Sequence, residues 1–154
     1  MSIVYRKATL RDIPAMQTLV RPEIDSGIIL ERSDNEIATN IRSYQLAWDG
    51  ERLIGFVALH IHTPVLAETR SLIVAEPYRG QQVGSTLIGR CLEEAEVLGL
   101  SEVLALTYRR EFFEKLGFVE ISKESLPEHK IWADCIKCKH FPVCNEIALI
   151  KRLS

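Results

Sequence analysis

The sequence predicts one α/β domain in which helices flank a mixed, mostly antiparallel, twisted sheet. With 154 residues, the chain is long enough for a single substantial core. An apolar run from Ser71 to Val74 has the length of a buried strand, and a long amphipathic helix follows it. Asp49-Gly50 lies between two other apolar stretches, and this dipeptide is typical of a β-hairpin turn.

The composition is that of an ordinary globular protein. Hydrophobic residues make up 47% of the chain and charged residues 26%, and the formal net charge is −2. This charge argues against nucleic acid or an anionic membrane as a partner. No apolar run approaches transmembrane length, and the N-terminus has no secretory pattern. We therefore expect a cytoplasmic protein whose thiols are reduced.

The first third of the chain predicts a strand from Ile3 to Lys7 followed by two helices. The first helix tolerates Pro14 because proline is accepted in a first turn. The second begins at the capping box that runs from Ser33 to Glu36. The apolar residues expected on the inner sides of the two helices are Ile13, Met16, Leu19 and Val20 in the first, and Ile37, Ile41 and Tyr44 in the second.

Two strands, from Gln45 to Trp48 and from Arg52 to His62, are predicted to form the hairpin. His60 and His62 alternate with Ile61 on the second strand. A histidine on a strand is more often structural than catalytic, so we interpret both only as residues that line a site.

The rest of the chain continues the alternation of strands and helices. Glu102 to Leu106 predicts a buried strand, Glu111 to Leu116 a short helix that ends at Gly117, and Phe118 to Ile121 another strand. The long helix before them has one apolar face, made of Val83, Leu87, Cys91, Ala95 and Leu98.

The segment from Arg79 to Gly84 connects the central strand to the N-terminus of the long helix. Free N–H groups and the helix dipole at such a position favour an anion, especially a phosphate. Gly80 and Gly84 would let a pyrophosphate approach the backbone, because they have no Cβ. The spacing differs from the dinucleotide pattern G-x-G-x-x-G. An ordinary glycine-containing turn is the alternative.

This segment resembles the acyl-CoA loop of GCN5-related N-acetyltransferases, whose pattern is Gln/Arg-x-x-Gly-x-Gly/Ala. Arg79 and Gly84 take the outer positions, whereas Gln82 stands where the middle glycine is usual. The resemblance extends from Ile3 to Leu153. Together with the sequence pattern, it implies about seven strands and about four helices. It also implies acetyl-CoA as the co-substrate and no metal in catalysis.

A narrower resemblance is to short, single-domain members that are similar to N-acetylglutamate synthase. The segments that carry it are Leu30 to Ser33, Leu66 to Leu72, Leu104 to Tyr108, Glu111 to Phe118, Trp132 to Cys138 and Phe141 to Glu146. It implies acetyl transfer to the α-amine of glutamate or a related amino acid, which is the first step of arginine biosynthesis. Attack would be direct, in a ternary complex, because no cysteine or serine is placed as an acyl carrier.

Glu68 and Arg70 are two residues apart on an extended segment, so their side chains are expected to point to one face. Beside an acyl-CoA loop, the pair would act as a general base and a carboxylate clamp, because an ammonium must lose a proton before its nitrogen attacks a thioester. A surface salt bridge is the alternative.

By resemblance, Glu68 maps to the catalytic glutamate and Arg32 to an arginine that binds a substrate carboxylate. Arg70 is added from its position, since two cations suit a substrate with two carboxylates.

The resemblance also implies the residues of the cofactor site, and it shows that the family's usual general acid is absent from this sequence. In the family, a tyrosine in the last motif commonly protonates the leaving CoA thiolate, but Phe113 occupies its place here. Tyr108 is the nearest replacement in the sequence, and protonation from water is the alternative. The residues expected to bind acetyl-CoA are Leu72, Ile73, Val74, Arg79, Gly80, Gln81, Gln82, Val83, Gly84, Ser85 and Phe112.

Two other functions stay open at this point. One is acetyl transfer to a different small amine or to a protein N-terminus. The other is a non-catalytic sensor of acetyl-CoA, which the departures at Gln82 and Phe113 suggest. The sequence does not decide between glutamate and glutamine, and it leaves the oligomeric state open, a homodimer included.

A cysteine-rich cluster near the C-terminus raises the question of a metal. Cys135 and Cys138 have the spacing of zinc ligands, and His140 and Cys144 follow. Against zinc, Cys138 and His140 are too close in sequence for the usual ligand spacing. We therefore expect no metal and three half-buried thiols that pack the last hairpin, with a structural zinc as the alternative.

Overall fold

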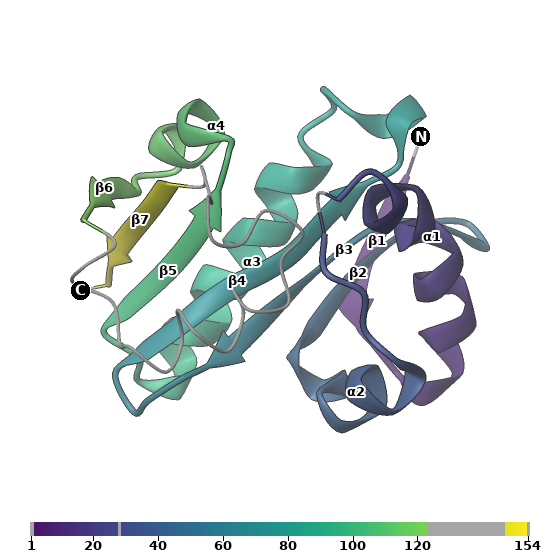
Figure 1. Ribbon diagram of the computed structural model, residues 1–154, viewed down its shortest axis with the longest axis horizontal. Helices are drawn as coiled ribbons and strands as arrows, with labels where there is room; N and C mark the ends of the chain where they lie inside the picture. Colours follow the sequence, from purple (N-terminus) through teal and green to yellow (C-terminus); the bar gives the residue numbers. More distant parts are fainter. Residues whose placement is uncertain (1, 28, 123–146, 154) are drawn as a thin grey trace. The chain divides into compact units, whose positions relative to one another are not determined.

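The computed structural model describes residues 2–27, 29–122 and 147–153 (Figure 1). The cluster of Cys135, Cys138, His140 and Cys144 lies outside the described residues, so the zinc alternative stays a prediction.

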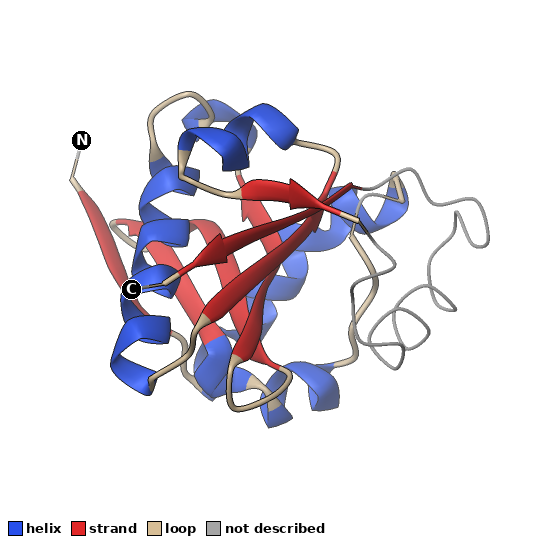
Figure 2. Cartoon of the chain, turned by 90° about the vertical axis from the view of Figure 1, so that its left-hand side faces the viewer, coloured by secondary structure: helices blue, strands red, loops and turns tan. Residues whose placement is uncertain are grey.

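The described chain folds into a mixed α/β structure built on one seven-stranded sheet (Figure 2). The strands are β1 Ile3–Lys7, β2 Tyr44–Asp49, β3 Arg52–Ile61, β4 Leu66–Val74, β5 Glu102–Thr107, β6 Val119–Ile121 and β7 Ile147–Arg152. The α-helices are α1 Ile13–Asp25, α2 Asp34–Thr39, α3 Val83–Leu98 and α4 Arg110–Lys115. The sheet order is β1-β2-β3-β4-β5-β7-β6, and the pairs β1–β2, β2–β3, β5–β7 and β6–β7 are antiparallel. The predicted fold class is confirmed.

Contacts divide the chain into two compact units. The first unit comprises the described residues of Met1–His60 and Thr69–Glu94, and the second those of Ile61–Glu68 and Ala95–Ser154. Strand β4 therefore contributes its beginning to the second unit and its remainder to the first.

In the first unit, α1 and α2 bury their apolar sides against β2, β3 and the end of β4. The shared core is made of Ile13, Met16, Val20, Ile24, Ile37, Tyr44, Leu46, Leu53, Phe56, Ala58 and Ile73.

Helix α3 packs closely against Gly55 of β3: a Cβ built at Gly55 would lie 3.3 Å from Leu87 and 3.4 Å from Val83. The same Cβ would lie only 2.9 Å from the Ile73 carbonyl oxygen. Glycine at position 55 thus lets β3, β4 and α3 approach one another closely.

In the second unit, β5 pairs with β7 over the full length of both strands, from Glu102 opposite Arg152 to Thr107 opposite Ile147. A smaller core of Leu66, Leu104, Ala148 and Ile150 lies among these strands.

Two predictions about the helices were wrong. Helix α2 ends at Thr39, and Tyr44 begins β2 instead of continuing the helix. Tyr44 is nevertheless buried in the α1 core, because pairing of β2 with β1 and β3 presents its side chain there. Leu98 does not belong to the apolar face of α3: its side chain is 54% exposed where the helix ends.

The connection from β4 to α3 requires unusual backbone conformations. Gly80 has a φ of +80° and Gln82 a φ of +65°. Glycine adopts such angles readily, whereas a residue with a Cβ does so at a cost. The amide Nε2 of Gln81 donates to the Pro77 carbonyl at 3.2 Å, and the Thr86 hydroxyl donates to the Gln82 carbonyl at 2.8 Å. These bonds hold the loop in shape although Gln82 replaces the glycine usual at that position.

We predict that Gln82→Gly stabilises the protein. Relief of the left-handed backbone is worth about 1–2 kcal/mol, and the added chain entropy of glycine offsets about 0.5–1 kcal/mol of it. A net gain of up to about 1 kcal/mol in the free energy of unfolding is expected, measured by urea denaturation.

Gln81→Gly is the matched control, because Gln81 is not among the described residues with a positive φ. It should lose at least about 0.5–1 kcal/mol, because glycine adds chain entropy and the hydrogen bond from Gln81 Nε2 to the Pro77 carbonyl is removed. Equal destabilisation by both substitutions would show that Gln82 carries no backbone strain.

Candidate functional site

Glu68 is a buried carboxylate near the start of β4. Its Oε1 lies 2.9 Å from Nε2 of His62, and the two side chains are each only 5% exposed. At this distance, the imidazole N–H donates a hydrogen bond to the carboxylate. Both residues belong to the second unit. A surface salt bridge, the alternative considered for Glu68, does not fit this degree of burial.

His62 comes directly after β3 and is brought to Glu68 by the tight connection between β3 and β4. Sequence reasoning gave it no more than a lining role. Their spacing on either side of a tight hairpin could have predicted the contact. Residues on the same face of paired strands lie next to one another even when they are several positions apart in sequence.

Arg32 and Arg70, both in the first unit, influence the pKa of the same buried residue, Tyr44. Burial raises the pKa of Tyr44, whereas the positive charges of Arg32 and then Arg70 oppose that rise. The Arg32 guanidinium lies 3.9 Å from the Glu36 carboxylate. The backbone carbonyl of Arg32 accepts a hydrogen bond from Gln17 Nε2 at 2.9 Å. Sequence reasoning missed Tyr44, because it placed this residue on a helix.

A backbone irregularity in β4 separates Arg70 from the end of the strand. Ser71 has a φ of +57°, in the left-handed region, within an otherwise extended segment. A left-handed residue interrupts the regular extended conformation of a strand. Two residues later, Ile73 packs in the same core as Tyr44.

All residues predicted to bind the cofactor except Phe112 lie in the first unit, between Leu72 and Ser85, whereas Phe112 belongs to the second unit. Val83, Gly84 and Ser85 are the first residues of α3, where N–H groups have no partner within the helix. Gly80 and Gln81 are exposed in the loop before them, and Leu72, Ile73 and Val74 end β4.

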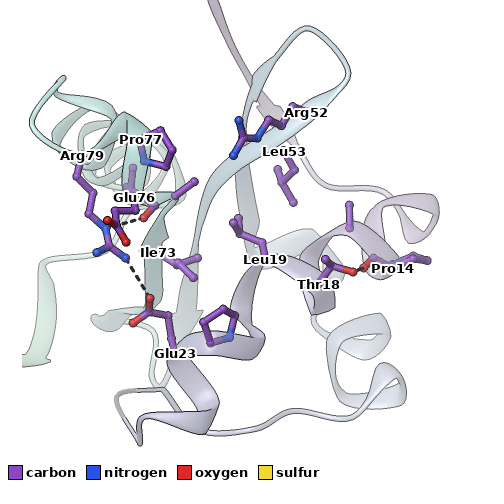
Figure 3. A pocket seen from close by; sticks show the side chains of 14 residues that line it. Pro14, Thr18, Leu19, Glu23, Arg52, Leu53, Ile73, Glu76, Pro77 and Arg79 are labelled. Atoms are coloured by element: carbon purple, nitrogen blue, oxygen red, sulfur yellow. Dashed lines mark hydrogen bonds and ion pairs between the residues drawn. The ribbon is translucent and has the colours of Figure 1, made fainter.

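Arg79 links this loop to its surroundings. Its Nε donates to the Val74 carbonyl at 2.9 Å, and its Nη2 lies 3.0 Å from Oε1 of Glu23 on α1 (Figure 3). A pocket of about 600 Å³ lies beside this ion pair, between α1 and the end of β4. Its lining is mostly apolar and includes Leu19 and Ile73, with Arg52 as a further cation.

The aromatic residues after β5 belong to the second unit. Phe113, at the position of the usual tyrosine, is buried and contacts Phe112 and Phe118 edge to face, with centroids 5.0 and 5.2 Å away. It is therefore a core residue with no proton to give. Tyr108 directly follows β5 and is 49% exposed, so its role as the acid stays a prediction.

The described part of the chain gives little support for a metal site, a membrane span or a cysteine nucleophile. No group of three or more His, Cys, Asp or Glu residues there could hold a metal ion. None of the helices within the described ranges is long and apolar enough to cross a membrane. Burial raises the pKa of the Cys91 thiol to about 12, so Cys91 is protonated near neutral pH and is not a nucleophile.

Comparison with known proteins agrees with this geometry. The model of the Acetyltransferase (GNAT) family matches residues 10–118. An uncharacterized N-acetyltransferase of Chlorobaculum tepidum is 36% identical over 148 residues, which cover 96% of this chain and 95% of that protein. An amino-acid acetyltransferase of Mycobacterium tuberculosis is 32% identical over 124 residues, which cover 77% of this chain and 69% of the relative.

A solved structure is also similar in fold. N-acetylglutamate synthase from Neisseria gonorrhoeae, complexed with coenzyme A and N-acetyl-glutamate, superimposes with a TM-score of 0.87 at 26% identity. The match covers all of this chain but only 36% of the gonococcal chain. On the match to the family and to these relatives, the chain belongs to the GNAT family of acetyltransferases.

Proposed function

We propose that this chain transfers the acetyl group of acetyl-CoA to the α-amine of glutamate or a closely related amino acid. As a GNAT acetyltransferase it uses acetyl-CoA as the acyl donor. The choice of substrate is supported by two arginines of the first unit, Arg32 and Arg70, which both lower the pKa of the buried Tyr44, because two cations suit a substrate with two carboxylates. The names of the mycobacterial and gonococcal relatives support the same choice, which would place the reaction first in arginine biosynthesis.

In this proposal, acetyl-CoA lies along the end of β4 and the start of α3. The N–H groups of Val83, Gly84 and Ser85 and the positive end of the helix dipole would hold the pyrophosphate. The backbone of Leu72, Ile73 and Val74 would hydrogen-bond the pantetheine arm. Arg79 is fixed beside this segment by Glu23 and adds a positive charge. Gln82 keeps a left-handed backbone at the position where the family pattern has glycine, which supports a retained cofactor site.

The chemistry assigned to Glu68 is removal of one proton from the substrate ammonium, directly or through one water. The freed amine attacks the thioester carbonyl carbon, a C–N bond forms, and the C–S bond breaks as the tetrahedral intermediate collapses. The attacking nitrogen loses its second proton to solvent as the intermediate collapses, which leaves a neutral amide and CoA as the thiolate. The thiolate takes a proton from Tyr108 or from water. Because a thiol has a pKa of about 8.5, its thiolate leaves readily, so an acid at this step contributes less than the base.

The substrate would be held by its two carboxylates. We assign Arg32 to the α-carboxylate and Arg70 to the distal carboxylate. Charge-assisted, bidentate contacts of this kind orient a substrate as well as bind it. Tyr44, whose pKa both arginines lower and whose side chain is buried, would form the floor of this site.

Glu68→Gln is expected to lower kcat with glutamate by about 10²–10⁴-fold, the usual worth of a general base. Affinity for acetyl-CoA should stay within a few-fold, because Glu68 makes no contact with the cofactor in this proposal. The measurement is steady-state kinetics of CoA release, with calorimetry of acetyl-CoA binding.

Glu102→Gln is the control, since Glu102 is a strand carboxylate paired with an exposed arginine, Arg152, at 3.4 Å. It should leave turnover unchanged. Turnover of Glu68→Gln close to wild type across the pH range would rule out Glu68 as the base.

Substitution of the two arginines should separate the two carboxylates of the substrate. Arg32→Ala is expected to weaken glutamate and glutamine alike, because every amino acid has the α-carboxylate. Arg70→Ala should affect glutamate far more, because the amide of glutamine has no charge to lose. The expected loss is about 2–4 kcal/mol, which is roughly 30- to 1000-fold in kcat/KM.

The control is Arg11→Ala, an exposed arginine of the first unit, measured at the same ionic strength. A change of only a few-fold for both substrates in both arginine variants would place the amino-acid pocket elsewhere.

A further inference from the structure

The contact between His62 and Glu68 is the feature of the second unit that the proposed reaction does not explain. Its two atoms are 2.9 Å apart, and each side chain is 5% exposed. A buried ionised carboxylate without a hydrogen-bond donor is strongly disfavoured and takes up a proton instead. A protonated carboxyl group cannot accept the proton of an ammonium, so a base at this position depends on its donor.

Hydrogen bonds within the turn between β3 and β4 hold the backbone of His62 in position. His62 N–H donates to the Leu66 carbonyl at 2.9 Å, and the N–H groups of Val65 and Leu66 donate to the Thr63 hydroxyl at 3.1 and 3.0 Å. These bonds close the connection between β3 and β4 into a short, internally bonded turn. Glu68 follows two residues after Leu66, so the register of the turn places the ring against the carboxylate.

The chemistry of the contact defines which nitrogen holds the proton. An ionised carboxylate has acceptor sites only, so Nε2 of His62 must be the donor. A neutral imidazole with its hydrogen on Nε2 satisfies this requirement, as does an imidazolium. In both forms, the bond favours the ionised carboxylate and restricts its rotation.

We propose that His62 is a positioning residue for the general base: through its Nε2–H it keeps the Glu68 carboxylate ionised and oriented toward the amine. This inference rests on the proposed function of Glu68. It assigns no proton transfer to His62 itself.

The test compares His62→Gln with His62→Asn. The amide nitrogen of glutamine reaches about as far as Nε2 of histidine, whereas that of asparagine reaches only as far as Nδ1. His62→Asn and His62→Leu should lower kcat by about 10–100-fold, the usual cost of removing a group that orients a catalytic residue. KM for acetyl-CoA should stay within a few-fold. His62→Gln should recover most of the lost turnover.

The double variant Glu68→Gln with His62→Asn should be no slower than Glu68→Gln alone, because the two residues act as one unit. Circular dichroism checks folding. If His62→Leu does not fold, the two amide variants decide the question by themselves. Equal turnover of the glutamine and asparagine variants, or additive losses in the double variant, would overturn the role of His62.

These outcomes are separable from failure of the proposed function. Loss of turnover in Glu68→Gln but not in His62→Asn would overturn only the role of His62. Wild-type turnover in Glu68→Gln would overturn Glu68 as the base, and the positioning role with it.

Discussion

A carboxylate is stable in a protein interior only if a donor compensates for the water that it loses, and β4 buries such a group at Glu68. The hydrogen bond from His62 meets this requirement. It also links the sequence of the turn between β3 and β4 to the chemistry proposed for the strand, because the turn sets the position of the ring. An enzyme that deprotonates an ammonium near neutral pH needs both properties in its base: an ionised state and a fixed direction.

The remainder of β4 and the loop after it contain two left-handed backbone conformations. Ser71 adopts one within the strand, and Gln82 adopts the other at the entrance to α3. Both residues carry a Cβ, so both cost conformational energy that the surrounding hydrogen bonds and packing must offset. Backbone strain of this kind concentrates where function requires a particular geometry. Its presence in the loop favours a retained cofactor site over a degenerate one.

The sequence predicted those features that depend on neighbouring residues. The capping box of Ser33 and Glu36 has both of its hydrogen bonds, at 3.1 Å each, and Asp49-Gly50 forms the expected hairpin. Tyr44 was assigned to the wrong element, because strand pairing over long sequence distances overrides a local helical pattern. The contact of His62 with Glu68 could not be read from either residue alone, since it depends on the length and register of a turn.

The most direct test of the account is the rate of CoA thiol release from acetyl-CoA with a panel of amines: glutamate, glutamine, other L-amino acids, a polyamine and a short peptide. The account predicts the highest kcat/KM for glutamate or glutamine, with negligible release when no amine is present. Mass spectrometry of the product should show one acetyl group on the α-amine. Faster release with a polyamine or a peptide would contradict the assignment of an amino-acid substrate. Binding of acetyl-CoA without release for any amine would contradict the assignment of an enzyme.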